Sequence, residues 1–291
     1  MKNKADLQEK TIILAGSGRS GTTWLGNIIS ANPNIGILFE PFDHRRVPEI
    51  EPLKLFTYAR TGQEYPAIEQ VVHDMLMGQI TNEWVDQQKR RTHLFVRKNL
   101  VKTIRANLML GWITKKFNPK VVYAMRHPCA VIHSRIKLNW TTSLDHFLHQ
   151  EELVEDYLSD HVGWIQDSTD LVEQQAIVWC IENLVPLHQI AKHNWLLCTY
   201  EHMVRDPFNE STKVLKHLDI SPTWFTRRAL NRASMVSRPD SAINSGSDPL
   251  ADWQKKLSAD DVSKILNVLE RFEIDIYSDQ LMPNLDGLKM P

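Results

Sequence analysis

The chain has 291 residues, of which 42% are hydrophobic and 24% are charged, and its formal net charge is -1. A chain of this length and composition can bury a sizeable core, which predicts one large domain or one domain with a helical insertion. The near-neutral charge excludes a general attraction to nucleic acid or to anionic membranes, so any anion binding must be local.

The first predicted element is a strand that leads into an anion-binding turn. The run from Thr11 to Ala15 is short, apolar and rich in β-branched residues, as in a buried parallel strand. Apolar residues then recur at helical spacing from Trp24 to Ile29, so the segment from Gly16 to Gly21 must turn sharply from strand into helix. The N–H groups of such a turn and of the first helical turn point at one spot, where the helix dipole adds partial positive charge.

The side chains of this turn favour phosphate as the ligand. Arg19 supplies a full charge, and the hydroxyls of Ser20, Thr22 and Thr23 can donate to phosphate oxygens. The alternative is a structural turn whose serine and threonines only cap the helix, but such a turn has no use for an arginine. The pattern Gly-Lys-Ser/Thr is missing, which disfavours a kinase or ATPase that uses Mg-ATP.

The rest of the chain alternates strands with helices. A second strand from Ile35 to Phe39 is stopped by Pro41, which leaves Glu40 at its carboxyl end. The pattern predicts an α/β fold with a P-loop-like central parallel sheet flanked by helices, whose ligands lie at the carboxyl ends of the strands. Further strands are predicted near 93–101, 121–125 and 195–200, helices at about 66–79, 104–117, 129–138, 171–192, 207–218, 222–232 and 259–272, and a loop at 238–252.

An acidic stretch separates two parts of this pattern. No lysine or arginine occurs between Lys137 and Lys192, whereas aspartate and glutamate are frequent there. This shift in charge predicts a helical acidic insertion or lid at about 141–191 that does not touch the nucleotide and forms a solvated surface. A role facing an acceptor is the alternative.

A second anion site is predicted on the same edge of the sheet. Arg126 ends the strand at 121–125, and Ser134 lies eight residues further, about two turns along the next helix. Arg126 could cap a helix or line the core edge, but its place at the carboxyl end of a strand favours a phosphate ligand. Two anion sites on one edge suit a nucleotide phosphorylated at both its 5′ and 3′ positions.

These motifs resemble those of the sulfotransferases that use 3′-phosphoadenosine 5′-phosphosulfate (PAPS). The run SGRSGTTW is similar to that family's 5′-phosphosulfate-binding loop, and Arg126-His127-Pro128 followed by Ser134 resembles its 3′-phosphate-binding motif. The segments from Tyr200 to Pro207 and from Asp248 to Trp253 resemble later segments of the family. The resemblance covers most of the chain and implies a single sulfotransferase domain over residues 1–291.

The resemblance also implies which residues bind the nucleotide. Trp24 would stack on adenine, although a plain role in the helix core is the alternative. The implied cofactor-binding residues are Arg19, Ser20, Gly21, Thr22, Thr23, Trp24, Arg126, Ser134 and Tyr200.

The sequence differs from the cytosolic small-molecule sulfotransferases at two positions that concern the catalytic residues. Cytosolic small-molecule sulfotransferases carry a lysine in the loop and a histidine in a Lys-Thr-His motif, whereas this chain has Arg19 in the loop and Ile104 after Lys102-Thr103. The run Phe39-Glu40-Pro41 instead resembles carbohydrate sulfotransferases, where the glutamate is a candidate base. Glu40 could otherwise be an exposed strand end or a partner for an arginine, and His44 is the second candidate base.

We therefore predict an enzyme that moves the sulfuryl group of PAPS to an acceptor hydroxyl, of a saccharide or glycolipid, and leaves adenosine 3′,5′-bisphosphate (PAP). Glu40 is the predicted base, and Arg19 with Lys102 stabilises the leaving phosphate. A sulfuryl group carries one negative charge, so fixed cations suffice and no metal is required. The alternatives are a small alcohol or phenol as acceptor, a P-loop phosphotransferase, and a non-catalytic nucleotide-binding module.

The sequence also predicts where the protein is found. Residues 1–10 are polar and charged, and no run approaches the roughly 20 apolar residues that span a bilayer. A cytoplasmic location without a transmembrane segment is expected. The three cysteines lack the C-x-x-C spacing of a zinc site.

Overall fold

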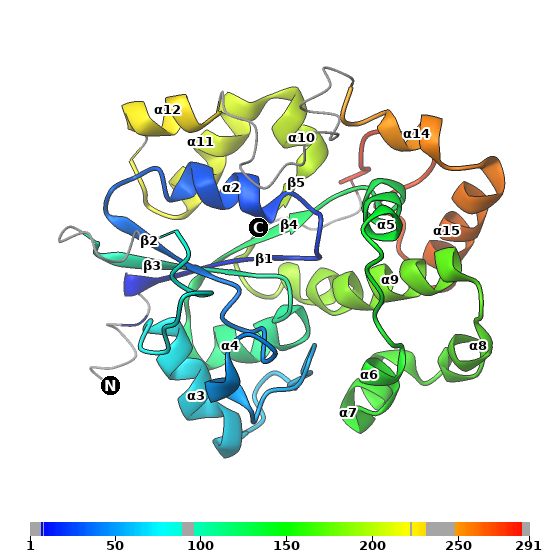
Figure 1. Ribbon diagram of the computed structural model, residues 1–291, viewed down its shortest axis with the longest axis horizontal. Coiled ribbons are helices and arrows are strands. Elements are labelled where there is room, and N and C mark those ends of the chain that lie inside the picture. The colour runs from blue at the N-terminus through cyan, green and yellow to red at the C-terminus, as the bar shows by residue number, and fades with distance from the viewer. Residues whose placement is uncertain (1–6, 8, 89–95, 222, 231–247, 287–291) are drawn as a thin grey trace.

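A five-stranded parallel sheet organises the molecule (Figure 1). The computed structural model describes residues 7, 9–88, 96–221, 223–230 and 248–286. The order in the sheet is β2-β3-β1-β4-β5, so the chain moves from β1 first to one side and later to the other. The carboxyl end of β1 is therefore a topological switch point, where open α/β sheets bind ligands. The strands are β1 (Thr11–Gly16), β2 (Ile35–Phe39), β3 (Lys98–Thr103), β4 (Lys120–Met125) and β5 (Leu196–Thr199).

Helices cover both faces of the sheet, because side chains of β1 alternate between two hydrophobic clusters. Ile12 and Leu14 pack with residues of α2, whereas Ile13 and Ala15 join the larger cluster on the other face. Figure 1 shows α2, α10, α11 and α12 above the sheet and α3, α4 and α9 below it. The bounds are α2 (Thr22–Ile29), α3 (Pro66–Leu76), α4 (Leu110–Phe117), α9 (Leu171–Ile190), α10 (Tyr200–Arg205), α11 (Pro207–His217) and α12 (Trp224–Leu230).

The remaining helices lie mainly beside the carboxyl edge of the sheet and in the connections. They are α5 (Pro128–Lys137), α6 (Asp145–Leu148), α7 (Glu151–Leu153), α8 (Val162–Asp167), α14 (Asp252–Lys256), α15 (Ala259–Arg271), two 3-10 turns, η1 (Pro48–Ile50) and η3 (Asn107–Met109), and a π-helical turn, η4 (Val154–Leu158). Within the described ranges, no helix is both long and apolar enough to cross a bilayer.

The predicted fold class is confirmed, and most predicted elements are present within a few residues of their expected ends. The strand at 35–39 has the predicted bounds. A capping box opens α15, since the Ser258 hydroxyl accepts from Asp261 N–H while the Asp261 carboxylate accepts from Ser258 N–H.

The predicted helix at 104–117 begins too early. Residues 104–106 are not helical, and the first helical turn is η3. The N–H of Ile104 donates to the Glu40 carboxylate at 3.0 Å, and the N–H of Arg105 donates to the Thr103 hydroxyl at 3.1 Å. Side-chain oxygens thus accept hydrogen bonds from the two N–H groups that hydrophobic periodicity had placed in the helix.

The prediction of a solvated acidic surface is wrong for the second half of the 141–191 stretch. Helix α9 contacts α4, α5 and α15, and most of its residues from 175 to 190 are buried. Glu182, one of the acidic residues, is only 2% exposed. The apolar residues of α9 surround the whole helix, as expected for a core helix rather than a surface one.

Some predicted features lie outside the described residues. They are residues 93–95 of the proposed strand at 93–101, both ends of the helix at 222–232, and most of the loop at 238–252.

Candidate active site

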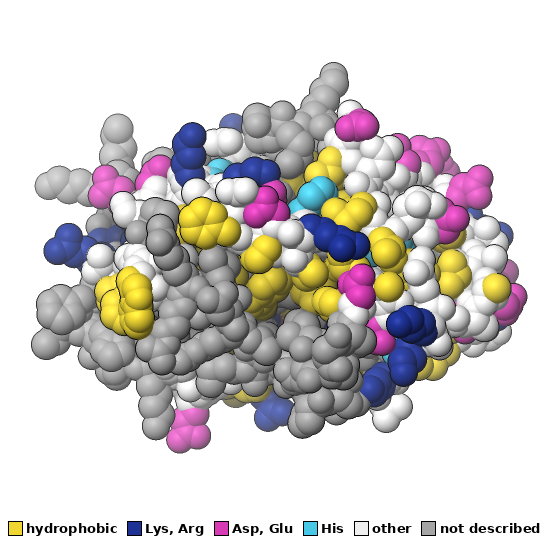
Figure 2. All heavy atoms as spheres, turned by 90° about the horizontal axis from the view of Figure 1, so that it is seen from above, with side chains coloured by type: hydrophobic (Ala, Val, Ile, Leu, Met, Phe, Trp, Pro, Cys, Tyr) yellow, Lys and Arg dark blue, Asp and Glu magenta, His cyan; other side chains and the backbone are white. Residues whose placement is uncertain are grey.

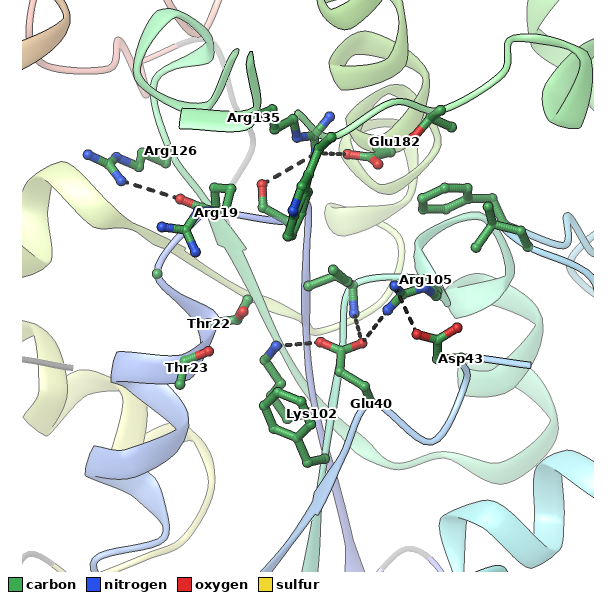
Figure 3. Close-up of a pocket in the computed structure, with 18 of the residues that line it drawn as sticks. Arg19, Thr22, Thr23, Glu40, Asp43, Lys102, Arg105, Arg126, Arg135 and Glu182 are labelled. Atoms are coloured by element: carbon green, nitrogen blue, oxygen red, sulfur yellow. Dashed lines mark hydrogen bonds and ion pairs between the residues drawn. The ribbon is translucent and has the colours of Figure 1, made fainter. Parts of the chain in front are cut away.

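A cavity of about 750 Å³ opens at the carboxyl edge of the sheet, next to the turn between β1 and α2 (Figure 3). Residues from this turn, from the ends of β2, β3 and β4, and from α5, α9 and α10 line it. The volume lies within the range of small-molecule sites and is sufficient for a nucleotide together with part of a second ligand.

The turn between β1 and α2 has the geometry of a phosphate cradle. Gly21 has φ 84°, in the left-handed region, and an added Cβ would lie 2.7 Å from Cδ2 of Tyr200. Arg19 also has a positive φ of 78°. No side chain in the described part of the chain caps α2, so its first N–H groups face the cavity with the dipole's positive end. Thr22 and Thr23 line the cavity beside them.

The two predicted anion sites are adjacent. Nε of Arg19 donates to the Ser134 hydroxyl at 2.9 Å, and Nη1 of Arg126 donates to the carbonyl of Arg19 at 3.4 Å. The Arg126 guanidinium lies over the Tyr200 ring, 4.1 Å from its centroid, and donates to the carbonyl of Pro249. Figure 3 shows Arg19 and Arg126 on one side of the cavity, above Thr22 and Thr23. Arg19, predicted for the 5′ end, thus also reaches the 3′-phosphate motif.

The other predicted nucleotide residues differ in exposure. Trp24 lines the cavity and packs edge-on against Tyr200, with ring centroids 5.9 Å apart, while also packing against the core cluster below α2. Both interpretations of Trp24 are therefore compatible with its position. Ser20 is 2% exposed, its hydroxyl bonds that of Ser17 at 3.0 Å, and it does not line the cavity.

A buried cluster of charges lies across the cavity from Arg126 and surrounds Glu40 (Figure 3). One Glu40 oxygen forms an ion pair with Lys102, and the other accepts from Ile104 N–H at 3.0 Å and from Arg105 at 3.2 Å. Arg105 also bonds Asp43 at 3.1 Å. Glu40 is 3% exposed and Lys102 is 4% exposed, so the pair is largely shielded from bulk water. Glu40 and Lys102 are thus brought together. Glu40 is not an exposed strand end, and its contact with Arg105 fits the alternative interpretation of a partner for an arginine.

His44, the second candidate base, does not line the cavity. Burial lowers the pKa of its imidazole, and Nδ1 has no hydrogen-bond partner among the described residues. Glu40 is the better placed of the two candidates.

A second buried ion pair was not predicted from the sequence. Arg135, on α5, bonds the Glu182 carboxylate of α9 at 2.5 Å and donates from the same Nη2 to the carbonyl of Gly18 at 3.3 Å. Burial raises the pKa of Glu182, while the Arg135 charge opposes that shift. In the sequence, only its position directly after Ser134 could have indicated that Arg135 lies near the site. Glu182 was missed because the acidic stretch was assigned to a solvated surface.

Comparison with known proteins shows to which family this chain belongs. The model of the sulfotransferase family matches residues 11–225, which include both phosphate motifs and the Glu40 cluster. The chain belongs to the sulfotransferase family. Sulfuryl transfer is therefore its activity, and PAPS is the donor, in agreement with the uncapped α2 terminus and the two cations that border it.

Two solved sulfotransferase domains share the fold at low sequence identity. The sulfotransferase domain of the Synechococcus PCC 7002 olefin synthase is 17% identical, with 92% of this chain and 96% of that chain covered and a TM-score of 0.50. The sulfotransferase domain of the curacin biosynthetic pathway is 14% identical, with 91% and 97% covered and a TM-score of 0.51. Mouse sulfotransferase SULT7A1, solved with PAP, is 15% identical, with 92% and 87% covered and a TM-score of 0.49. No curated protein matches the chain.

Proposed function

We propose that this sulfotransferase acts on the hydroxyl of a saccharide or glycolipid, with Glu40 as the base and Lys102 and Arg19 stabilising the leaving phosphate. The observation that carries the proposal is the contact of Glu40 with Lys102 at the carboxyl end of β3, next to the turn between β1 and α2. The bound donor supplies an activated sulfuryl group, and the chain supplies position, charge and a proton acceptor.

The donor end of the cavity would hold the nucleotide by fixed positive groups. The α2 terminus with Thr22 and Thr23 suits the 5′-phosphosulfate, and Arg126 with Ser134 suits the 3′-phosphate. Arg126 is already oriented by the Tyr200 ring and by two carbonyls, so little side-chain entropy is lost when it binds an anion. Ser20 would shape the loop rather than contact the nucleotide, because its hydroxyl is buried.

The catalytic step would depend on a change of partner at Lys102. Oε1 of Glu40 is paired with Lys102, and Oε2 accepts from Ile104 N–H and from Arg105, so an acceptor hydroxyl would have to share Oε1 with the Lys102 ammonium. A phosphosulfate beside Lys102 offers its ammonium a competing anion, which releases Oε1 of Glu40. Glu40 would then take the hydroxyl proton while the acceptor oxygen bonds to sulfur. The bond between sulfur and the bridging phosphate oxygen would break, PAP would leave, and Lys102 and Arg19 would stabilise the charge on that oxygen.

The acceptor side of the cavity combines aromatic faces with hydrogen-bonding groups, which favours a saccharide. Trp84, which packs against Phe39 at the end of β2, lines it together with polar side chains. A sugar ring offers an apolar face for stacking and hydroxyls for bonding, so this combination suits it. A phenol is the alternative, because the hydrophobic side chains Leu55, Phe56 and Ile104 also line the cavity.

The experiment is a turnover assay that measures PAP release from PAPS with p-nitrophenyl β-D-glucoside, p-nitrophenyl β-D-galactoside or 2-naphthol as acceptor. We expect turnover with a glycoside, and a loss of about 10²- to 10⁴-fold in Glu40→Gln with unchanged PAP affinity. Glu173→Gln is the control, since the Glu173 carboxylate accepts from the Ser168 hydroxyl and does not line the cavity. Near-normal turnover in Glu40→Gln would contradict its role as base, and turnover with 2-naphthol alone would contradict the saccharide assignment.

A further inference from the structure

The acceptor side of the cavity has a basic and aromatic rim formed by Arg46 and Trp84. The Arg46 guanidinium lies over the Trp84 ring, 5.2 Å from its centroid, and both side chains line the cavity. Trp84 in turn packs edge-on against Phe39, at the end of β2, with ring centroids 5.3 Å apart. This Arg46–Trp84 rim is therefore continuous with the strand that places Glu40.

Hydrogen bonds hold the rim in place. The N–H of Arg46 donates to the carbonyl of Asp43 at 2.8 Å, and the Asn82 side chain donates to the carbonyl of Arg46 at 2.9 Å. The Asn82 side chain also accepts from Val85 N–H, and the Val85 carbonyl accepts from Phe39 N–H at 2.9 Å. The backbone on both sides of the rim is thus tied to the end of β2.

Positive charge exceeds negative charge on this side of the cavity. Glu40 is shared by Lys102 and Arg105, and Asp43 is shared by Arg105 and Arg45. Two carboxylates therefore face four basic side chains, namely Lys102, Arg105, Arg45 and Arg46. Within the described part of the chain, Arg46 forms no ion pair with a carboxylate, and its guanidinium contacts the Trp84 ring.

A stacked arginine alone does not indicate a ligand site. The Arg271 guanidinium lies over the Trp164 ring, 4.8 Å from its centroid, and this pair is outside the cavity. Such a cation–π contact at an exposed site contributes about 0.5–1 kcal/mol to the stability of the folded protein. Arg46 differs because its charge faces a cavity that already has an excess of cations. When Lys102 turns to the donor, Arg46 and Arg45 still remain on the acceptor side. An anion is the chemical group that matches them.

We propose that the acceptor is an acidic saccharide, which carries a carboxylate or sulfate that Arg46 binds while Trp84 packs against its ring. This inference rests on the proposed function and narrows it, since the acceptor hydroxyl must reach Glu40 while the anionic group reaches the rim. The planar guanidinium can bind a carboxylate with two hydrogen bonds, a geometry that a lysine cannot reproduce.

The test is isothermal titration calorimetry of the protein saturated with PAP, using phenyl β-D-glucuronide and phenyl β-D-glucoside as probes. The glucuronide carries a carboxylate at the position where the glucoside carries a hydroxymethyl group. We expect the glucuronide to bind at least about tenfold more tightly, because hydrogen bonds to a charged group exceed neutral ones. Arg46→Gln should erase the difference, Arg46→Lys should restore only part of it, and Arg271→Gln should leave it unchanged.

Equal affinities, no detectable binding of the glucuronide, or a preference that survives in Arg46→Gln would overturn the inference. PAP affinity, measured first in every variant, should be the same as in the unaltered protein. If PAP itself fails to bind, the proposed function fails, and the titration is repeated without it. A glucuronide preference that Arg46→Gln then erases would uphold the anion subsite by itself.

Discussion

At the scale of single residues, Gly21 is a position where both the backbone conformation and the available space require glycine. Its φ of 84° is in the left-handed region, and any Cβ would meet the Tyr200 ring that supports Arg126. The requirement for glycine thus has two separable parts, one conformational and one steric. Gly62 shares only the first, since its φ is 90° and an added Cβ would meet no atom of the described residues within 4 Å.

Gly21→Ala and Gly62→Ala form a matched pair that separates these parts. Both should lose about 1 kcal/mol of unfolding free energy from left-handed strain. Gly21→Ala should in addition displace Tyr200 and weaken PAP binding by at least about tenfold, as judged by calorimetry. Similar PAP affinities in the two variants would show that the contact with Tyr200 does not shape the nucleotide site.

Single residues were predictable where the local pattern sets the chemistry. Arg19, Arg126 and Glu40 follow strands, and the sequence placed them on one edge of the sheet. Arg105 and Asp43 could not be found in this way, because their role depends on β2 and β3 being neighbours in the sheet. Strand order is a tertiary property that hydrophobic periodicity does not encode.

At the scale of elements, the Arg135–Glu182 pair connects α5, α9 and the phosphate loop. Arg135 is buried, with 4% of its side chain exposed, and it bonds both Glu182 and the Gly18 carbonyl. Trp140 covers the other side of Gly18, where an added Cβ would lie 2.7 Å from the indole ring. The loop is therefore held by the elements around it as well as by its own turn.

Breaking this pair should affect stability and binding in different ways. Glu182→Gln leaves a buried arginine without its counter-ion and should cost about 3 kcal/mol of unfolding free energy in denaturant titrations. The double variant Arg135→Met with Glu182→Leu should recover most of that stability, since apolar replacement of a buried pair is often neutral. It should still bind PAP about fivefold or more weakly, because the Gly18 carbonyl has lost its donor.

A double variant that binds PAP as tightly as the unaltered protein would contradict a positioning role for Arg135. The pair would then serve only the packing of α5 against α9.

Elements with strong periodicity were predicted well, and the errors have specific causes. Helix α9 was assigned to the surface from its charge, although its acidic residues include Glu182, whose partner lies on another helix. The start of the 104–117 helix was misplaced because Glu40, distant in sequence, takes the N–H of Ile104. In both cases an ion pair or a hydrogen bond between residues distant in sequence outweighed the local pattern of charge or hydrophobic periodicity.

At the scale of the whole molecule, the net charge is close to zero, and positive charge is concentrated at one cavity. The net charge is -1, and acidic and basic side chains are interspersed over the described part of the face that carries α10, α11, α12 and α14 (Figure 2). The cavity, by contrast, gathers Arg19, Arg126, Lys102 and further arginines at one edge of the sheet. Composition could therefore exclude a general polyanion binder, whereas only the fold could reveal the excess of positive charge on the acceptor side.

The central claim is that this edge binds a nucleotide by two anion sites. The most direct measurement is thermal stability of the purified protein with PAP, compared with adenosine 5′-monophosphate and with Mg-ATP. PAP at about 100 times its dissociation constant should add roughly 2.7 kcal/mol to the unfolding free energy. Arg126→Gln should remove most of this gain, because Arg126 is the proposed ligand of the 3′-phosphate. Stabilisation by Mg-ATP alone, or by none of the three, would contradict the account.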